Sequence, residues 1–267
     1  MCLTCGCGDG EVRVEGHPHD HEAPHDLLVV EQRLLAKNDH LAEHVRASLA
    51  VRNVTSFNLM SSPGSGKTSL LERTIAELGD DRTVCVIEGD QETSFDADRI
   101  RAAGARAVQI NTGAGCHLDA SMVHDALHQL DPPSGSLLFV ENVGNLVCPA
   151  LFDVGERAKV VVISVTEGDD KPLKYPHMFR AADLVVVNKT DLLPYVDFDV
   201  DRLTEQARRL KPEVRVLPVS VRTGENLDAW FAWLDSVVDE GVSDGSAATE
   251  STHSSHLGRH SGATVRT

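Results

Sequence analysis

The chain has 267 residues, of which 41% are hydrophobic and only 4% aromatic, so one large α/β domain or two small ones can form around an aliphatic core. Its 25 Lys and Arg residues against 41 Asp and Glu residues give a net charge of −16, and this acidity argues against a DNA- or RNA-binding protein because phosphates would be repelled. The sequence shows neither a run of about 18 apolar residues nor a secretory signal, so we expect a cytoplasmic protein without a membrane partner, in which the six Cys are thiols or metal ligands.

Segments typical of strands and helices alternate between residues 27 and 240. Apolar positions at helical spacing predict a first helix over 27–50. Apolar runs that indicate strands buried on both faces occupy 56–60, 83–88, 107–110, 137–141, 160–165, 184–188 and 214–219. Further helices are predicted over 67–78, 97–103, 119–129, 200–210 and 226–238. This alternation predicts an α/β fold with a doubly wound, mainly parallel sheet of about seven strands, whose ligands bind beyond the carboxyl ends of the strands.

Residues 1–26 are rich in Cys and His and have almost no apolar periodicity. Three thiols, Cys2, Cys5 and Cys7, lie close enough along the chain to converge on one ion. Thiolates together with the terminal amine suit square-planar Ni(II) or a soft tetrahedral ion. The imidazoles within residues 17–25 are a second candidate for metal binding, and a solvated segment is the alternative.

The segment SSPGSGKT at residues 61–68 follows an apolar run and opens a predicted helix. It matches the phosphate-binding P-loop, except that Ser61 replaces the first glycine. Small residues allow backbone N–H groups to wrap around phosphate oxygens. Lys67 would reach the β- and γ-phosphates, and the Thr68 hydroxyl would bind Mg²⁺. The predicted phosphate-binding residues are Ser62, Gly64, Ser65, Gly66, Lys67, Thr68 and Ser69.

Two carboxylates follow predicted strands and could complete a site for Mg²⁺ and the attacking water. Asp90 comes just after the second strand, and Glu141 ends the fourth. Either could hold Mg²⁺ or its waters, and Asp90 could also orient the attacking water. With Lys67 they form the predicted catalytic set. The backbone N–H of Gly144 would meet the γ-phosphate and move when that group is lost.

A second group of candidate metal ligands, Cys116, His117 and Cys148, lies inside the predicted domain. The two Cys follow successive strands, so their loops should meet at the edge of the sheet where the nucleotide binds. Two Cys and one His are too few to close a soft metal site, and water or a second subunit must complete it. If Cys148 lies on the segment that senses the γ-phosphate, metal affinity and nucleotide state are reciprocally coupled.

The motif Asn188-Lys189-Thr190-Asp191 ends another predicted strand and indicates guanine recognition. The Asp191 carboxylate can accept from guanine N1–H and the exocyclic amine together, a donor pair that adenine lacks. The Lys189 stem would cover the base, and Asn188 would connect the loops. Ser220, after the last strand, would offer a backbone N–H to the guanine O6.

Residues 241–267 are rich in Ser, Thr, Gly and His and lack the large apolar side chains that offset ordering entropy. We therefore expect three parts: a Cys/His-rich metal-binding segment (1–26), a P-loop GTPase domain (27–240) and a disordered tail (241–267).

Together, these motifs resemble those of the hydrogenase maturation GTPases that deliver nickel to [NiFe]-hydrogenase, the HypB family. The resemblance covers about residues 1–240 and rests on CxxCGC, SSPGSGKTSLL, EGDQET, NTGAGCHLDA, ENVGNLVCP, EGDDKPLKYP and NKTD. It implies a P-loop GTPase of the branch shared with urease-accessory GTPases, with GTP, Mg²⁺ and Ni²⁺ as ligands. It also implies a high-affinity nickel site at Cys2, Cys5 and Cys7, and a Ni/Zn site at Cys116, His117 and Cys148.

The resemblance further implies that GTP promotes a homodimer with this internal metal site near the interface. GTP hydrolysis would then be coupled to nickel delivery, with a small nickel/zinc accessory protein and the hydrogenase large subunit as partners. Lys171 and Lys174 would reach the partner subunit or its nucleotide.

Three alternatives to this function remain open from the sequence. The number of thiols and imidazoles would also suit a nickel-buffering protein with a vestigial nucleotide site. A urease-type nickel GTPase would have the same fold but would deliver nickel to urease instead of hydrogenase. An ATPase of the same branch would bind a different nucleotide, although the guanine motif argues against it.

Overall fold

The computed structural model describes the backbone of residues 25–79, 81–91 and 95–253, and the side chains of residues 32–79, 81–91 and 95–241. Cys2, Cys5, Cys7, most of the predicted N-terminal metal-binding segment and residues 254–267 therefore lie outside the described residues.

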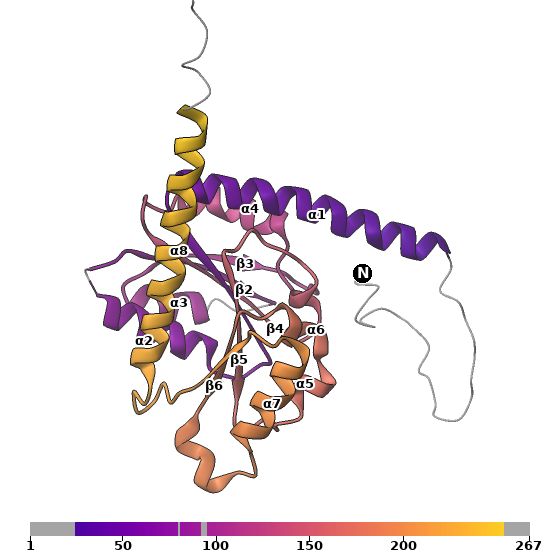
Figure 1. Cartoon of the computed structure of the whole chain (residues 1–267), viewed down its shortest axis with the longest axis vertical. Coiled ribbons are helices and arrows are strands. Elements are labelled where there is room, and N and C mark those ends of the chain that lie inside the picture. Colours follow the sequence, from indigo (N-terminus) through magenta and orange to yellow (C-terminus); the bar gives the residue numbers. More distant parts are fainter. Residues whose placement is uncertain (1–24, 80, 92–94, 254–267) are drawn as a thin grey trace, which may run out of the picture.

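A seven-stranded parallel sheet forms the centre of the molecule (Figure 1), which confirms the predicted fold class. The strands lie in the order β3-β2-β4-β1-β5-β6-β7. Their bounds are β1 Thr55–Ser61, β2 Val84–Asp90, β3 Arg106–Asn111, β4 Leu137–Gly144, β5 Ala158–Ser164, β6 Leu184–Asn188 and β7 Arg215–Pro218. Since every strand runs in the same direction, the loops that follow them gather at one edge.

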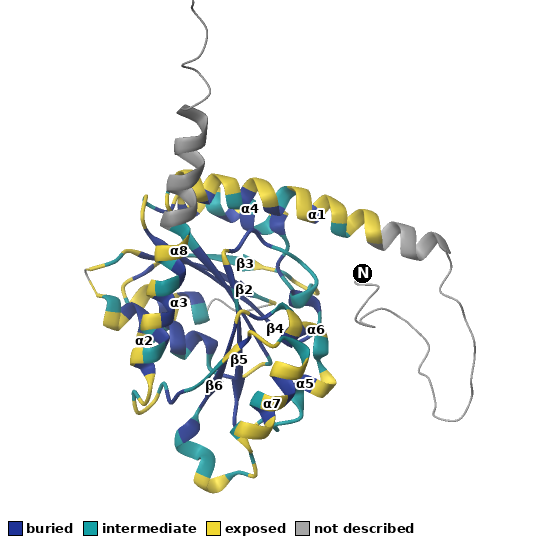
Figure 2. Ribbon diagram, in the orientation of Figure 1, coloured by how far each residue is buried: buried dark blue, intermediate teal, exposed yellow. Residues whose placement is uncertain are grey.

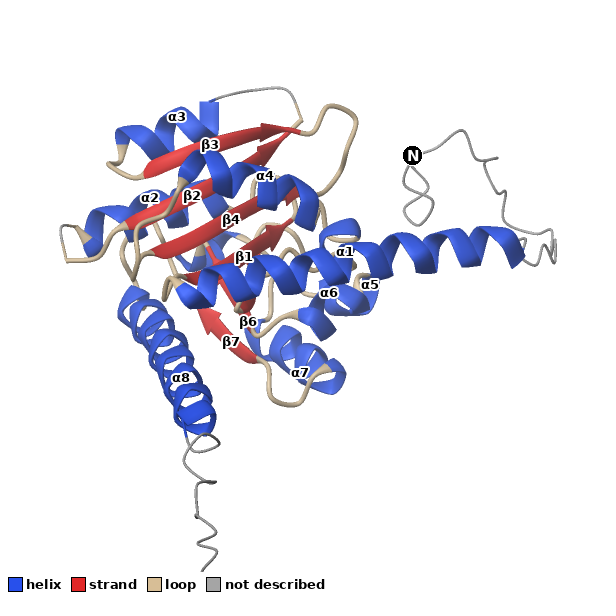
Figure 3. Cartoon of the chain, turned by 90° about the horizontal axis from the view of Figure 1, so that it is seen from above, coloured by secondary structure: helices blue, strands red, loops and turns tan. Residues whose placement is uncertain are grey.

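Helices cover both faces of this sheet (Figure 3). They are α1 His25–Val51, α2 Lys67–Leu78, α3 Phe95–Ala102, α4 Ala120–Leu130, α5 Lys171–Lys174, α6 Pro176–Ala181, α7 Val200–Leu210 and α8 Leu227–His253. Two short 3₁₀ turns, η1 Cys148–Ala150 and η2 Thr190–Tyr195, follow β4 and β6.

Alternate side chains along β5 show how the two faces are divided. Val160 and Val162 belong to a core built with α2, α3 and α8, whereas Val161 and Ile163 belong to a core built with α6 and α7. A third cluster packs α1 and α4 against β2 and β4. The five inner strands are consequently among the most buried elements (Figure 2), as their near-continuous apolar sequences predict. The edge strands β3 and β7 contain no buried residue, because each has a neighbouring strand on one side alone.

The chain departs from the sequence-based expectations mainly at short helices and at the C-terminus. Residues 241–253, expected to begin a disordered tail, continue α8 instead. This helix is already nucleated on the buried Trp230 and Trp233, and extending a helix is easier than starting one. The short helices α5 and α6 were not predicted, because they are too brief to show a periodic pattern and Pro176 separates them. None of the described helices is both long and apolar enough to span a membrane.

Candidate nucleotide and metal sites

The P-loop connects the end of β1 at Ser61 to the start of α2 at Lys67. Gly64 and Gly66 have φ angles of 76° and 100°, in the left-handed region that favours glycine. A Cβ atom on Gly66 would lie 2.5 Å from Nδ2 of Asn188, whereas one on Gly64 would meet no heavy atom within 4 Å. Gly66 is therefore required by its own conformation and by the close approach of the predicted guanine motif.

Lys67 and Thr68, the first residues of α2, both lie beside Glu141. Nζ of Lys67 donates to Oγ of Ser61 at 2.6 Å, so the serine that departs from the P-loop pattern contacts the phosphate-binding lysine. Burial lowers the pKa of Lys67, and the Glu141 carboxylate opposes this shift. Oγ1 of Thr68 donates to Oε1 of Glu141 at 2.7 Å. The predicted phosphate and Mg²⁺ groups are thus brought together.

Glu88 is a second buried carboxylate at this site; it opens the EGDQET motif but had no predicted role. It pairs with Glu141 in the register of β2 and β4, and Oε2 of each has no hydrogen-bond partner within the described part of the chain. Burial, followed by the charges of Glu141 and Asp90, raises the pKa of Glu88 to about 8. Burial also raises the pKa of Glu141. Orphaned carboxylate oxygens beside a threonine hydroxyl fit Mg²⁺, which prefers hard oxygen ligands.

A cavity of about 510 Å³ lies over these groups. Asp90 and Gln91 both line it; Asp90 is half-buried, and its Oδ1 accepts from the backbone N–H of Gln91 at 2.8 Å. Arg99 of α3 also lines the cavity, and its Nη2 pairs with Oε2 of Glu72 at 2.6 Å. The remaining lining comes from Pro63, Gly64, Ser65, Gly66, Lys67, Thr68, Ser69, Glu88, Gly89, Asp96, Glu141, Asn142, Val143, Gly144 and Lys189.

The predicted guanine motif is attached directly to the P-loop. Nδ2 of Asn188 donates to the carbonyl oxygen of Ser65 at 3.0 Å, and Nζ of Lys189 donates to that of Gly64 at 2.7 Å. Oδ1 of Asn188 accepts from the backbone N–H groups of Lys189 and Val221. Asn188 therefore connects three loops, as its predicted role requires.

Asp191 and Ser220, which the sequence placed in one subsite, are in direct contact. Oγ of Ser220 donates to Oδ1 of Asp191 at 2.7 Å. Nη1 of Arg222 lies 3.7 Å from Oδ2 of the same carboxylate. Ser220 thus contacts the Asp191 side chain through its hydroxyl, while its backbone N–H donates to the carbonyl oxygen of Glu225 at 3.1 Å. The backbone contact from Ser220 to guanine stays a prediction.

Cys116, His117 and Cys148 converge although two of them are 32 residues from each other. The two sulfur atoms lie 2.9 Å apart, and all ligand atoms of the three residues fall within 4.8 Å of one another. The His117 ring stacks on Phe152 with a centroid distance of 4.0 Å. Burial lowers the pKa of His117 against the opposing effect of Asp119, which favours the neutral imidazole that binds metals.

A second cavity, of about 480 Å³, joins this cluster to the P-loop. Ser62, Pro63, Gly144 and Cys116 all line it. A Cβ atom on Gly144 would lie 3.1 Å from Pro63, so β4 ends in close contact with the P-loop. Cys116 of the cluster therefore shares a cavity with the side of the P-loop where Gly144 is predicted to meet the γ-phosphate.

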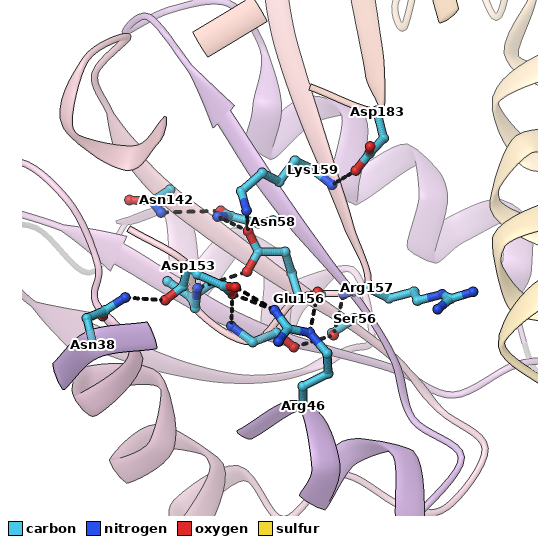
Figure 4. A network of polar contacts seen from close by, with 12 residues as sticks. Asn38, Arg46, Ser56, Asn58, Asn142, Asp153, Glu156, Arg157, Lys159 and Asp183 are labelled. Carbon is cyan, nitrogen blue, oxygen red and sulfur yellow. Dashed lines mark hydrogen bonds and ion pairs between the residues drawn. The ribbon is translucent and has the colours of Figure 1, made fainter. Parts of the chain in front are cut away.

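Asn142, which lies in the ENVGNLVCP motif but had no predicted role, joins the metal loop to β4. Its Oδ1 accepts from the backbone N–H groups of Leu118 and Val143, each at 3.0 Å. Its Nδ2 donates to Oδ1 of Asn58 at 3.2 Å, and Asn58 in turn donates to Oε1 of Glu156 (Figure 4). The loop that carries His117 is thus bonded to the strand that carries Glu141.

Lys171, predicted to reach a partner subunit, lies in α5 near the P-loop. Its Nζ is 3.5 Å from Oε2 of Glu167, the same oxygen that accepts from Oγ of Ser62. Lys174 is more exposed, and its Nζ pairs with Oδ2 of Asp170 at 2.6 Å.

Comparison with known proteins identifies the family. The model of the CobW/HypB/UreG nucleotide-binding domain matches residues 55–218. The chain belongs to the HypB family of hydrogenase maturation factors. It is 50% identical to HypB of Azotobacter vinelandii, over 88% of this chain and 92% of that protein. It is 44% identical to HypB of Escherichia coli K12, over 88% and 99%.

A solved HypB structure from Helicobacter pylori, described as a complex with nickel, superposes with a TM-score of 0.73 at 40% identity. The match covers 76% of this chain and 96% of that one. These relationships, together with the complete P-loop and guanine motif, show that this HypB family member is a GTPase.

Gly66→Ala tests the contact between the P-loop and the guanine motif. A left-handed conformation costs alanine about 1–2 kcal/mol at either P-loop glycine, but only at position 66 would the new methyl group also displace Asn188. We expect GDP affinity to fall about tenfold further in Gly66→Ala than in Gly64→Ala, which corresponds to about 1.4 kcal/mol. Titration with a fluorescent GDP analogue measures this, and equal losses in the two variants would contradict it.

Glu88→Gln tests the buried carboxylate pair without nucleotide or metal. Folding raises the Glu88 pKa from 4.5 to about 8, so the folded state binds more protons between these values. Its contribution to the free energy of unfolding therefore falls as pH rises through this window, by up to about 1.4 kcal/mol per pH unit.

We expect Glu88→Gln to flatten the pH dependence of urea unfolding between about pH 5 and pH 8 and to be more stable than wild type at the upper end. Glu205→Gln, which alters an exposed carboxylate on α7, is the matched control and should leave the slope unchanged. A wild-type slope in Glu88→Gln would show that Glu88 is ionised throughout.

Proposed function

We propose that the protein is a GTP-hydrolysing metallochaperone that couples GTP-dependent dimerisation and hydrolysis to nickel delivery in [NiFe]-hydrogenase maturation. The observation that carries this proposal is the cavity shared by Pro63 of the P-loop, Gly144 of β4 and the metal-ligand candidate Cys116. The nickel complex of the H. pylori relative supports nickel as the metal, and the names of the other relatives support the hydrogenase client.

The nucleotide cavity supports hydrolysis with Mg²⁺. Thr68, Glu141 and Glu88 are the residues that would hold the ion or its waters, and Asp90 lines the same cavity. Bound Mg²⁺ would neutralise charge on the β- and γ-phosphate oxygens. Lys67 would bind the same oxygens after leaving Ser61, and its partial desolvation strengthens that attraction. Asp90 would orient the attacking water, since it lines the same cavity as Lys67, Thr68 and Gly144.

Guanine selectivity would come from Asp191. Its carboxylate accepts from Ser220 and lies near Arg222, which fixes its orientation before the base arrives. A carboxylate in this position matches the two neighbouring donors of guanine. The aliphatic stem of Lys189, whose ammonium bonds to the P-loop, would cover one face of the base.

Nickel would bind to Cys116, His117 and Cys148 as cargo, and Zn²⁺ is the alternative ion. Two thiols and a neutral imidazole form a soft ligand set with an open position. Water or the second subunit of the dimer would fill that position. The predicted site at Cys2, Cys5 and Cys7 would hold nickel separately.

Dimerisation would occur on the side of the molecule where the metal and nucleotide cavities open. Lys171 lines the shared cavity, and the neighbouring Leu173 is 62% exposed. GTP would order residues 141–148 and bring two such surfaces together, and hydrolysis would release them. The accessory nickel/zinc protein and the hydrogenase large subunit would then exchange metal with this site through the cavity that Cys116 lines.

Asp191→Asn should strongly reduce GTP affinity without producing tighter ATP binding. The two neighbouring donors of guanine, N1–H and the exocyclic amine, need two acceptor oxygens, whereas the Asn side chain offers one acceptor oxygen and an NH₂ donor. We expect a loss of about 100-fold, or about 2.8 kcal/mol. Competition between GTP and ATP for a fluorescent nucleotide measures both affinities. Asp197→Asn, in the segment after η2, is the control. Unchanged nucleotide preference in Asp191→Asn would favour an ATPase.

Coupling between metal and nucleotide can be measured by titrating Ni²⁺ into the protein with GDP or a non-hydrolysable GTP analogue while following its mass in solution. We use a Cys2→Ala background, which weakens the predicted N-terminal site. The two nucleotides should give nickel affinities that differ at least about fivefold, and the analogue should double the mass. Cys148→Ala should remove the nucleotide dependence.

Cys85→Ala is the matched control for this titration, because Cys85 is a buried thiol of β2 outside the ligand cluster. It should retain the nucleotide-dependent affinity. If nickel affinity is identical with both nucleotides while the protein still hydrolyses GTP, the coupling between metal and nucleotide is contradicted. The assignment as a GTPase would still stand.

A further inference from the structure

The side chain of Asn38 connects α1 to two distant segments. Asn38 is only 9% exposed. Its Nδ2 donates to the carbonyl oxygen of Asp153 at 2.8 Å, and its Oδ1 accepts from the backbone N–H of Ala120 at 2.9 Å. These partners lie 115 and 82 residues further along the chain. Figure 4 shows Asn38 and Arg46 of α1 both reaching Asp153.

Each of these two segments carries ligands of the internal metal cluster. Ala120 begins α4, three residues after His117. Asp153 lies five residues after Cys148, and its neighbour Phe152 stacks on the His117 ring. Asn38 therefore forms hydrogen bonds shortly after the ligands in both segments: at Ala120 after His117, and at Asp153 after Cys148.

Further contacts hold the segment after Cys148, residues 153–155, against α1. Arg46 donates to both carboxylate oxygens of Asp153, at 2.7 and 2.6 Å. Gly155 packs so closely on α1 that a Cβ atom would lie 2.5 Å from Cγ1 of Val45. These contacts fix residues 153–155, whereas Asn38 alone among them also reaches the loop that carries Cys116 and His117.

We propose that Asn38 is a positioning residue of the Cys116–His117–Cys148 site, which sets how far apart the two metal-bearing segments lie. Its amide satisfies a buried donor at Ala120 and an acceptor at Asp153, so truncation would leave both without a partner and release the segments from each other. This inference rests on the proposed function only in taking the cluster as a metal site.

The test uses the full chain with Cys2, Cys5 and Cys7 replaced by Ala, so that the internal cluster supplies the thiolates. Co²⁺ is the probe, because its thiolate charge-transfer and ligand-field bands report ligand identity and geometry. Adding Cys148→Ala establishes which bands arise from the cluster. If that change leaves all the thiolate bands in place, the proposed metal site and the role of Asn38 are both overturned.

Asn38→Ala should weaken Co²⁺ binding about 10- to 100-fold, the usual effect of losing a group that orients metal ligands, and should shift the ligand-field bands. Asn38→Asp provides a second variant if the alanine protein does not fold. Its carboxylate can still accept from Ala120 but cannot donate to Asp153. We expect altered bands there as well, since one of the two segments loses its contact.

Leu49→Ala is the matched control, because Leu49 is a buried residue of α1 that packs in the core below β2 and β4. It should lower thermal stability while leaving Co²⁺ affinity and the bands unchanged. If Leu49→Ala weakens the metal site as much as Asn38→Ala does, the effect of Asn38 is one of general stability. If Asn38→Ala binds Co²⁺ with the wild-type spectrum and affinity, positioning is excluded while the metal site itself stands.

Discussion

The insertion of β4 between β1 and β2 is the constraint on which both sites depend. Its register places Glu141 opposite Glu88, and the loop after β1 brings Thr68 to the same point. Two carboxylates buried together are unfavourable unless a proton or a cation neutralises them. The parallel sheet therefore creates an acid pair whose charge a nucleotide–metal complex can compensate, and this links nucleotide binding to the most buried part of the fold.

The same strand connects this acid pair to the metal ligands. Directly after Glu141, the Asn142 amide accepts from the loop that carries His117, and two residues later Gly144 touches the P-loop. Cys148 then begins η1. Under the proposed function, a displacement at the end of β4 would reach the Cys148 sulfur through a few covalently linked residues and direct hydrogen bonds.

The sequence predicted those features that have a local physical signal. Apolar runs identified all seven strands, and the P-loop and guanine motif were placed correctly because each needs particular residues at fixed spacing. Parallel topology was enough to bring Cys116 and Cys148 together. The roles of Asn38 and Asn142 were not predicted, since a buried amide has no pattern of its own and its partners lie far away in the sequence. Glu88 looked like part of a strand, and only the register revealed its neighbour.

The two asparagines attach the metal cluster to different elements, and this difference bears on how a nucleotide could act on it. Asn142 belongs to the strand that contacts the P-loop and accepts from Leu118, whereas Asn38 belongs to α1 and accepts from Ala120. Cys148 lies between Gly144, which touches the nucleotide cavity, and Asp153, which is held by α1. If α1 holds Asp153 in place, loss of the γ-phosphate can move only the Gly144 end of the segment that carries Cys148. The distance from Cys148 to Cys116 and His117 would then change, and with it the affinity for the ion they share.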